Sequence, residues 1–227
     1  MNKMYIAFCG EGTTDERLFR NLTEELVQRI LLENNLTTEL SWSKIKKPSG
    51  SSEESLLQAA SQAKEQDILI FHRDADCSSR DECLKNHFNS ELQKIQAEDV
   101  SNRVKCIIPA IPIQESEAWM LCDKALLKEL LETNLNNQQL ELTYQVKHVE
   151  SIKDPKQIIQ RAIAIHREQL PARKRKLAVN LPDMYERFST EVSIDKLMQL
   201  PSFVTYQYDL RTAVKAIFGI KNLLPNI

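Results

Sequence analysis

The chain contains the run DILIFHRDAD at residues 67–76, in which four apolar residues lead directly into a charged segment with two aspartates. A short apolar run that stops abruptly at charged residues is typical of a strand buried on both faces, and such strands belong to parallel sheets. Further strands are predicted at residues 4–9, 38–42 and 104–111, each separated from the next by a helical pattern. This alternation predicts an α/β fold with a parallel sheet of about four strands flanked by helices.

Apolar side chains spaced three or four residues apart predict the helices. The first helix has such a stripe at Leu18, Leu22, Leu26 and Ile30, and Leu84, Phe88, Leu92 and Ile95 form another. Helix starts are predicted from three pairs with capping-box spacing, namely Thr13 with Glu16, Ser51 with Glu54, and Ser79 with Glu82. A helix is also expected over residues 114–131. After these come a weaker strand at 140–146 and helices at 155–167, 194–200 and 203–218. We therefore expect a domain at residues 1–135 and a mainly helical C-terminal extension at residues 136–227 packed on it.

Composition describes an ordinary globular chain of 227 residues, with 42% hydrophobic and 27% charged residues. The net charge of −2 excludes a global positive field, yet residues 151–227 hold 13 basic and 7 acidic side chains. A basic part beside an acidic part fits an anion-binding half next to a metal-binding half, although solvated surface alone would produce the same pattern. Five cysteines without CxxC spacing indicate reduced thiols and a cytoplasmic protein, and no apolar run approaches the length of a membrane span.

Acidic side chains follow three of the predicted strands. They are Glu11 with Asp15, Asp74 with Asp76, and Glu115 with Glu117. Ligands of an open parallel sheet bind beyond the carboxyl ends of its strands, so these acids are expected at one edge. Like charges that close destabilise one another unless a cation lies between them, and oxygen-only ligands suit Mg²⁺ or Mn²⁺.

Each of these features also has a purely structural explanation. Asp15 and Glu16 lie in a first helical turn, where acids favour the helix dipole, and Glu16 completes the expected capping box. Glu115 and Glu117 favour the start of the following helix in the same way. The glycines of the Gly10-x-Gly12 loop could cradle a phosphate, but the loop carries no nucleotide-binding fingerprint. The aspartate pair is also found in phosphatases of the haloacid dehalogenase type, where Gly-Thr or Gly-Val follows; here Cys77 and Ser78 follow, which disfavours that class.

Two groups of side chains are candidates for substrate binding. His72 and Arg73 adjoin Asp74, although an isolated histidine near a strand end is equally often a structural hydrogen bonder. The second group is the basic run Arg173, Lys174, Arg175 and Lys176. It is either a solvated helix end or a site that holds phosphates.

Three segments carry a resemblance to a known family. IAFCGEGTTD at residues 6–15 and ILIFHRDAD at 68–76 resemble the Toprim domain, which topoisomerases, bacterial primases and nucleases of the overcoming-lysogenization-defect (OLD) type share. IPIQESEAW at 111–119 resembles a bacterial Toprim-like family known as a domain of unknown function, in which an acidic pair precedes Ala-Trp. Its members look like companions of ATPases in mobile-element or phage-defence loci. Asp154-Pro-Lys156 and Pro201-Ser-Phe203 are weakly similar to the C-terminal part of that family.

The resemblance implies a Toprim-like Rossmannoid fold and a Mg²⁺-dependent (or Mn²⁺-dependent) nuclease acting on DNA or RNA. Glu11, Asp74 and Asp76 would hold one cation, with the strands ending at Glu11 and Asp74 adjacent. Asp15 and one of the two later glutamates would complete a second site. We prefer Glu117 to Glu115 there because Glu117 adjoins the Ala-Trp pair.

The chain also departs from the OLD-type nucleases. It contains no ATPase motif, so any motor must be a separate protein. The lysine that such nucleases use has no clear counterpart; Lys105 and the loop at residues 44–47 are candidates. The alternative function is a non-catalytic Toprim-like subunit that regulates an ATPase partner. A primase-like polymerase is less favoured, because we find no zinc-binding module and no template-binding extension.

Overall fold

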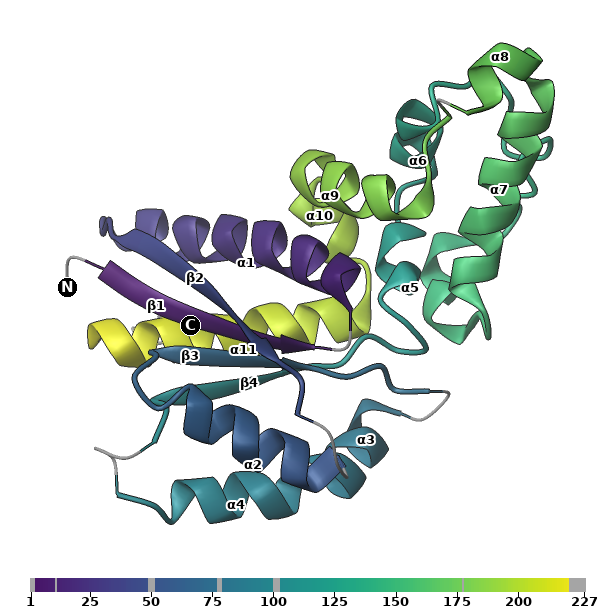
Figure 1. Ribbon diagram of the computed structural model, residues 1–227. Helices are drawn as coiled ribbons and strands as arrows, with labels where there is room; N and C mark the ends of the chain where they lie inside the picture. The colour runs from purple at the N-terminus through teal and green to yellow at the C-terminus, as the bar shows by residue number, and fades with distance from the viewer. Residues whose placement is uncertain are drawn as a thin grey trace, which may run out of the picture.

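The structure, a computed structural model, describes residues 3–10, 12–48, 52–76, 79–99, 103–176 and 178–220. Glu11, Ser51 and Cys77 lie outside these ranges, as do the side chains of Thr13, Ser52 and Glu53. A four-stranded sheet forms the centre of the molecule, in the order β2-β1-β3-β4 (Figure 1). The strands are β1 (Lys3–Gly10), β2 (Glu39–Lys46), β3 (Ile68–His72) and β4 (Cys106–Ala110), and every neighbouring pair is parallel. The predicted α/β fold is confirmed, and β1 lies next to β3 as expected.

Helices cover both faces of the sheet (Figure 1). Alternate residues of a strand point to opposite faces, so Ile68 and Ile70 of β3 enter one core while Leu69 and Phe71 enter the other. The first core is covered by α1 (Thr13–Glu33) and α11 (Pro201–Phe218). The second is covered by α2 (Ser52–Gln62), α3 (Arg80–His87) and α4 (Asn89–Gln96). The C-terminal helix α11 therefore covers the same face of the sheet as the N-terminal helix α1.

The remaining helices form a lobe beside the sheet, which we call the helical lobe. It consists of α5 (Glu117–Met120), α6 (Lys124–Leu130), a 3₁₀ helix (Val146–Ser151), α7 (Pro155–Gln169), α8 (Ala172–Arg175), α9 (Leu181–Glu191) and α10 (Ile194–Leu197). In Figure 1, α9 packs against α1, whereas α7 runs outward to α8 at the far end of the lobe. No helix within the described ranges is long and apolar enough to cross a membrane.

Three expected elements differ from the structure. The helix expected over 114–131 is two helices, because the chain turns after Met120 and Asp123 caps a new helix through the N–H groups of Ala125 and Leu126. The helix that begins after Ser79 breaks at Phe88, whose ring packs edge-on against Phe71. The strand expected at 140–146 is wrong. That segment is a run of turns that buries Leu140 and Leu142, so the apolar side chains there indicated burial without a sheet partner. Neither α8 nor α9 was predicted.

Candidate functional site

The strand order creates a crevice at the carboxyl end of β1. The chain leaves β1 towards β2 on one side, and β3 lies on the other side, so the ends of β1 and β3 form a topological switch point where ligands of α/β sheets bind. Gly10 closes β1 at this point. A Cβ atom there would lie 2.6 Å from Cζ of Phe8 and 3.3 Å from Cβ of His72, so only glycine fits between the two rings without displacing them.

Asp15 lies at the start of α1 and faces the crevice. Its Oδ2 accepts the backbone N–H of Gly12 at 3.1 Å, and its Oδ1 accepts the hydroxyl of Ser116 at 3.0 Å. The capping role expected of Glu16 therefore belongs to Asp15, because the helix is capped from Gly12 and not from Thr13. Glu16 instead forms an ion pair with Lys44, with Oε2 and Nζ 2.8 Å apart. Asp15 thus connects the end of β1 to the segment after β4.

His72 lies between the first two acidic groups. Its imidazole is fully buried, with the Phe19 ring centroid at 4.7 Å. Nε2 lies 3.2 Å from Oδ1 of Asp74, and Nδ1 lies 3.9 Å from Oδ2 of Asp15. Asp74 is partly exposed and therefore accessible to a ligand. The histidine thus lies between the ends of β1 and β3, next to the carboxylates of Asp15 and Asp74.

The segment after β4 brings two more carboxylates to the same place. Gln114 has a φ of 68°, and this turn precedes Glu115, Ser116 and the one-turn helix α5. Burial, followed by the charges of Glu117 and Asp74, raises the pKa of the Glu115 carboxyl. Within the described residues, Oε2 of Glu115 is buried without a hydrogen-bond partner. An unsatisfied carboxylate oxygen that feels two other acids fits a cation better than a purely structural role.

A lysine of α7 completes the cluster, and sequence reasoning missed it. Nζ of Lys156 lies 3.0 Å from Oε1 of Glu117, which is itself 2% exposed. Burial lowers the pKa of the Lys156 ammonium, but the hydrogen bond and charge of Glu117 outweigh it, so the pKa lies above its usual value. Asp154 caps α7 through the N–H of Gln157 at 2.9 Å, and Pro155 follows as its first residue. That Asp-Pro start was the available signal, since it places Lys156 in a first helical turn.

Tyr185 of α9 closes the cluster from the helical lobe. Burial, followed by the charge and hydrogen bond of Glu117, raises the pKa of its phenol, which therefore stays protonated and available as a donor. A hydrogen bond with Ser116 offsets a part of this rise in the pKa of the Tyr185 hydroxyl. We call the group formed by Asp15, His72, Asp74, Glu115, Glu117 and Lys156 the acid cluster.

Several predicted site residues lie away from the acid cluster. Arg73 directly follows β3 and acts on the Cys83 thiol in the other core, where it offsets part of the rise that burial causes in the pKa of that thiol. The Asp76 side chain is exposed, and its backbone lies in the left-handed region with a φ of 48°. Its negative charge contributes to the raised pKa of the Cys83 thiol. Glu11 lies outside the described residues. The ligand roles of Glu11 and Asp76 stay predictions.

The remaining basic candidates are also distributed elsewhere. Lys105 forms an ion pair with Asp67 at 2.5 Å, and both residues lie at the amino-terminal edge of the sheet, opposite the acid cluster. Lys44 forms an ion pair with Glu16. The run from Arg173 to Lys176 lies on and directly after α8, at the outer end of the helical lobe (Figure 1). Lys156, by contrast, contacts the cluster directly through Glu117.

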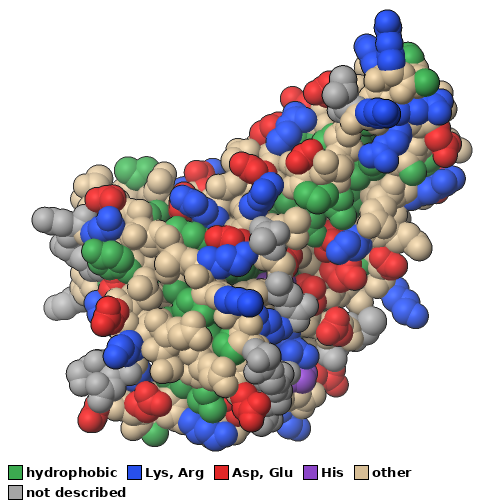
Figure 2. Space-filling model, viewed as in Figure 1, with side chains coloured by type: hydrophobic (Ala, Val, Ile, Leu, Met, Phe, Trp, Pro, Cys, Tyr) green, Lys and Arg blue, Asp and Glu red, His purple; other side chains and the backbone are tan. Residues whose placement is uncertain are grey.

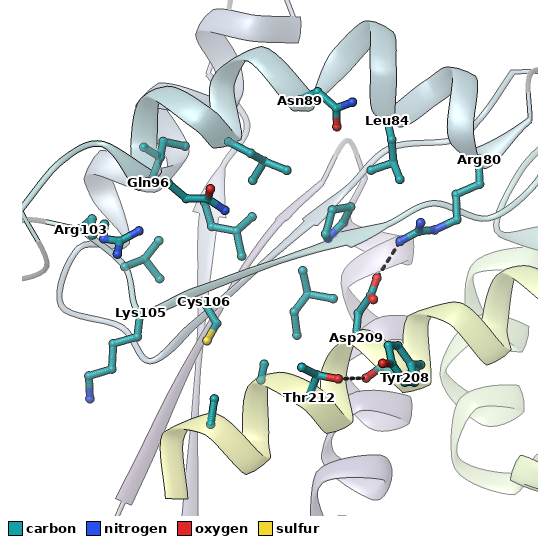
Figure 3. Close-up of a pocket in the computed structure, with 18 residues that line it drawn as sticks. Arg80, Leu84, Asn89, Gln96, Arg103, Lys105, Cys106, Tyr208, Asp209 and Thr212 are labelled. Carbon is teal, nitrogen blue, oxygen red and sulfur yellow. Dashed lines mark hydrogen bonds and ion pairs between the residues drawn. The ribbon is translucent and has the colours of Figure 1, made fainter. Parts of the chain in front are cut away.

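A separate hollow of about 520 Å³ runs along the edge strand β4, between α3, α4 and α11 (Figure 3). Its lining is largely apolar, and the Arg80 guanidinium and Asp209 carboxylate at its rim point toward each other 2.6 Å apart. These two charges neutralise one another. The hollow contains no residue of the acid cluster.

Comparison of the chain with protein-family models, with curated proteins and with solved structures found no match. The resemblance to the Toprim domain therefore rests on the motif segments at the ends of β1, β3 and β4. Within the described ranges, no group of three or more His, Cys, Asp or Glu side chains is arranged to hold a metal ion. Asp74 and Glu115 nevertheless offer oxygen ligands of the kind that Mg²⁺ prefers.

Proposed function

We propose that the chain is a Mg²⁺-dependent (or Mn²⁺-dependent) phosphodiester hydrolase that acts on nucleic acid. The observation that carries this proposal is the convergence of carboxylates from three separate strand ends at the switch point, with the Glu115 oxygen left unsatisfied. A fold has no structural need to gather acids in this way. A polyanionic substrate would not approach them unless a cation compensated their charge.

The residues of the cluster have distinct roles in this proposal. Asp74 and Glu115 would hold the cation together with Glu11, and either Glu11 or a metal-bound hydroxide would act as the general base. A divalent cation held there would supply Lewis-acid chemistry for the phosphate and for an attacking water. His72 orients Asp74, and the half-exposed ammonium of Lys156 offers a positive charge to the phosphate.

The test is hydrolysis of DNA and of RNA by the purified protein with Mg²⁺, with Mn²⁺ and with EDTA. Cleavage is expected only with a divalent cation. Asp74→Asn and Glu11→Gln should each lower the rate by about 100-fold or more, because each removes a charged group from the reacting centre. Mn²⁺ affinity, measured by calorimetry, should fall in the same variants.

Asp81→Asn is the matched control, since Asp81 is an exposed carboxylate in the first turn of α3 and lies outside the acid cluster. It should retain full cleavage and Mn²⁺ binding. Cleavage that survives unchanged in both Asp74→Asn and Glu11→Gln would contradict the proposal.

A second function is favoured by a different observation. Both oxygens of Asp15 already accept hydrogen bonds, and Glu117 forms an ion pair with Lys156, so each of these two acids has a partner without a metal. A non-catalytic subunit that regulates a separate ATPase fits this arrangement, and the Toprim-like family resemblance suggests such a partner. If an ATPase co-purifies stably while calorimetry detects no Mg²⁺ or Mn²⁺ binding, the regulatory function replaces the hydrolase. A cytoplasmic location belongs to both proposals.

A further inference from the structure

The positive charge of the C-terminal part is concentrated in one segment. Residues 151–176 hold eight basic and two acidic side chains, a net charge of +6, whereas residues 177–227 hold five of each. α7 and α8 make up most of this segment. α7 begins at the acid cluster, where Lys156 contacts Glu117, and it ends near α8. Figure 2 shows Lys and Arg side chains gathered at the outer end of the helical lobe.

One flank of α7 is free of acidic side chains. Residues spaced by three or four positions share a flank of a helix. On this flank lie Lys156, Gln160, Ala164 and Arg167, all of them exposed except Ala164, which is partly buried. The other exposed flank differs, because Arg161 there forms an ion pair with Glu141 at 3.2 Å and Glu168 adds a second acid.

The basic run after α7 divides into structural and exposed members. Arg175 donates to the carbonyl oxygens of Leu170 and Glu168 at 2.9 and 3.3 Å, and so closes the end of α7. Lys174 lines a hollow of about 600 Å³ between α6, α7 and α9. Arg173 and Lys176 are exposed at the outer end of the lobe.

We propose that the acid-free flank of α7, with Arg173 and Lys176 beyond it, is a track for the sugar–phosphate backbone of a nucleic acid. This inference rests on the proposed function, because it takes the reacting phosphate to lie at the acid cluster. α7 has 15 residues and is therefore about 22 Å long. At about 3.4 Å per base pair this length corresponds to about six or seven base pairs. The substrate is then a polymer that spans both ends of α7, and a mononucleotide or a very short duplex reaches only one end.

The test is fluorescence anisotropy of labelled DNA and RNA duplexes, and of the matching single strands, in EDTA. Affinity should rise steeply between about 4 and about 8 base pairs and then level off, since each phosphate contact adds to the counterions released. The triple variant Arg167→Gln, Arg173→Gln, Lys176→Gln should lose this rise. Its slope of log affinity against log salt should fall by about 2 to 3, close to one for each contact removed.

Two matched variants control for charge and folding. Arg161→Gln removes one positive charge from the other flank. It should lower the slope of log affinity against log salt by less than the amount expected for one phosphate contact. The charge-conserving variant Arg167→Lys, Arg173→Lys, Lys176→Arg should bind like the wild type. Vesicles with anionic phospholipid test a membrane surface as the partner instead of a nucleic acid.

The results separate this inference from the proposed function. Length-independent binding, an unchanged salt slope in the triple variant, or binding to vesicles but not to oligonucleotides would overturn the track, even if hydrolysis persists. Absence of hydrolysis together with length-dependent binding that the triple variant loses would contradict the hydrolase and leave the track standing.

Discussion

Glu115 is the residue whose charge the acid cluster accommodates least. Burial and the charges of Glu117 and Asp74 raise its pKa, so folding favours its protonated form. The stability it contributes is fully present below the unfolded pKa of about 4.3 and is lost as the pH rises through the higher folded pKa. In EDTA, Glu115→Gln should therefore leave stability nearly unchanged at about pH 4 and raise it at pH 7. Urea unfolding across this pH range measures the difference.

Addition of Mg²⁺ distinguishes a cation ligand from a merely buried acid. If Glu115 holds the cation, Mg²⁺ at pH 7 should stabilise the wild type more than Glu115→Gln, since the ligand binds only the folded state. Glu98→Gln changes an exposed carboxylate and is the control, with no pH-dependent gain expected. An equal Mg²⁺ effect in wild type and Glu115→Gln would exclude Glu115 as a ligand.

Among the elements, the short helix α5 depends on its connection to α11. The indole N–H of Trp119 donates to the Ser202 hydroxyl at 2.7 Å. The hydroxyl and the backbone N–H of Ser202 both donate to the Glu150 carboxylate. Ser202→Ala leaves the buried indole N–H unsatisfied, so we expect a loss of about 1 to 3 kcal/mol in the free energy of unfolding. Urea unfolding followed by tryptophan fluorescence measures this loss.

Thr205→Ala provides the comparison on the same helix. Its hydroxyl donates to a group of its own helix, the carbonyl oxygen of Pro201 at 3.0 Å. The expected change is below about 0.5 kcal/mol. Similar losses of unfolding free energy in the two variants would show that the hydrogen bond between Trp119 and Ser202 stabilises the fold no more than an ordinary hydroxyl of α11 does.

At the scale of the whole molecule, one apolar core crosses the expected boundary at residue 135. Ile6 and Ile70 of the sheet share a core with Phe203, Tyr206 and Leu210 of α11. A fragment of residues 1–135 would expose this face, at about 1.5 to 3 kcal/mol for each large apolar side chain left uncovered. We therefore expect the fragment to show no cooperative thermal transition by circular dichroism, in contrast to the full chain. A sharp transition in the fragment would establish residues 1–135 as an independent domain.

The sequence by itself determined the class of fold and the place of the candidate site. Buried strands such as residues 68–71 are visible as apolar runs, and the capping box of Ser79 and Glu82 is present as predicted. The acids after three strands could be placed at one edge for the same reason, because a strand end is a local feature and parallel strands end together. The helix break at Phe88 could not be predicted in this way, since packing of its ring against Phe71 accompanies it. The break after Met120 had a local signal in Asp123, which caps the next helix.

Only the tertiary structure decided which side chains meet. His72 and Arg73 are neighbours in sequence, yet His72 lies beside Asp74 whereas Arg73 acts on the Cys83 thiol of α3. Ser116 reaches Asp15 across 101 positions, and Lys156 comes to Glu117 from another helix. Such pairs depend on how helices pack on the sheet, which no local pattern encodes. The chain's own periodicities therefore place the acids at one edge, whereas long-range packing selects the lysine, the histidine and the hydrogen bonds that surround them.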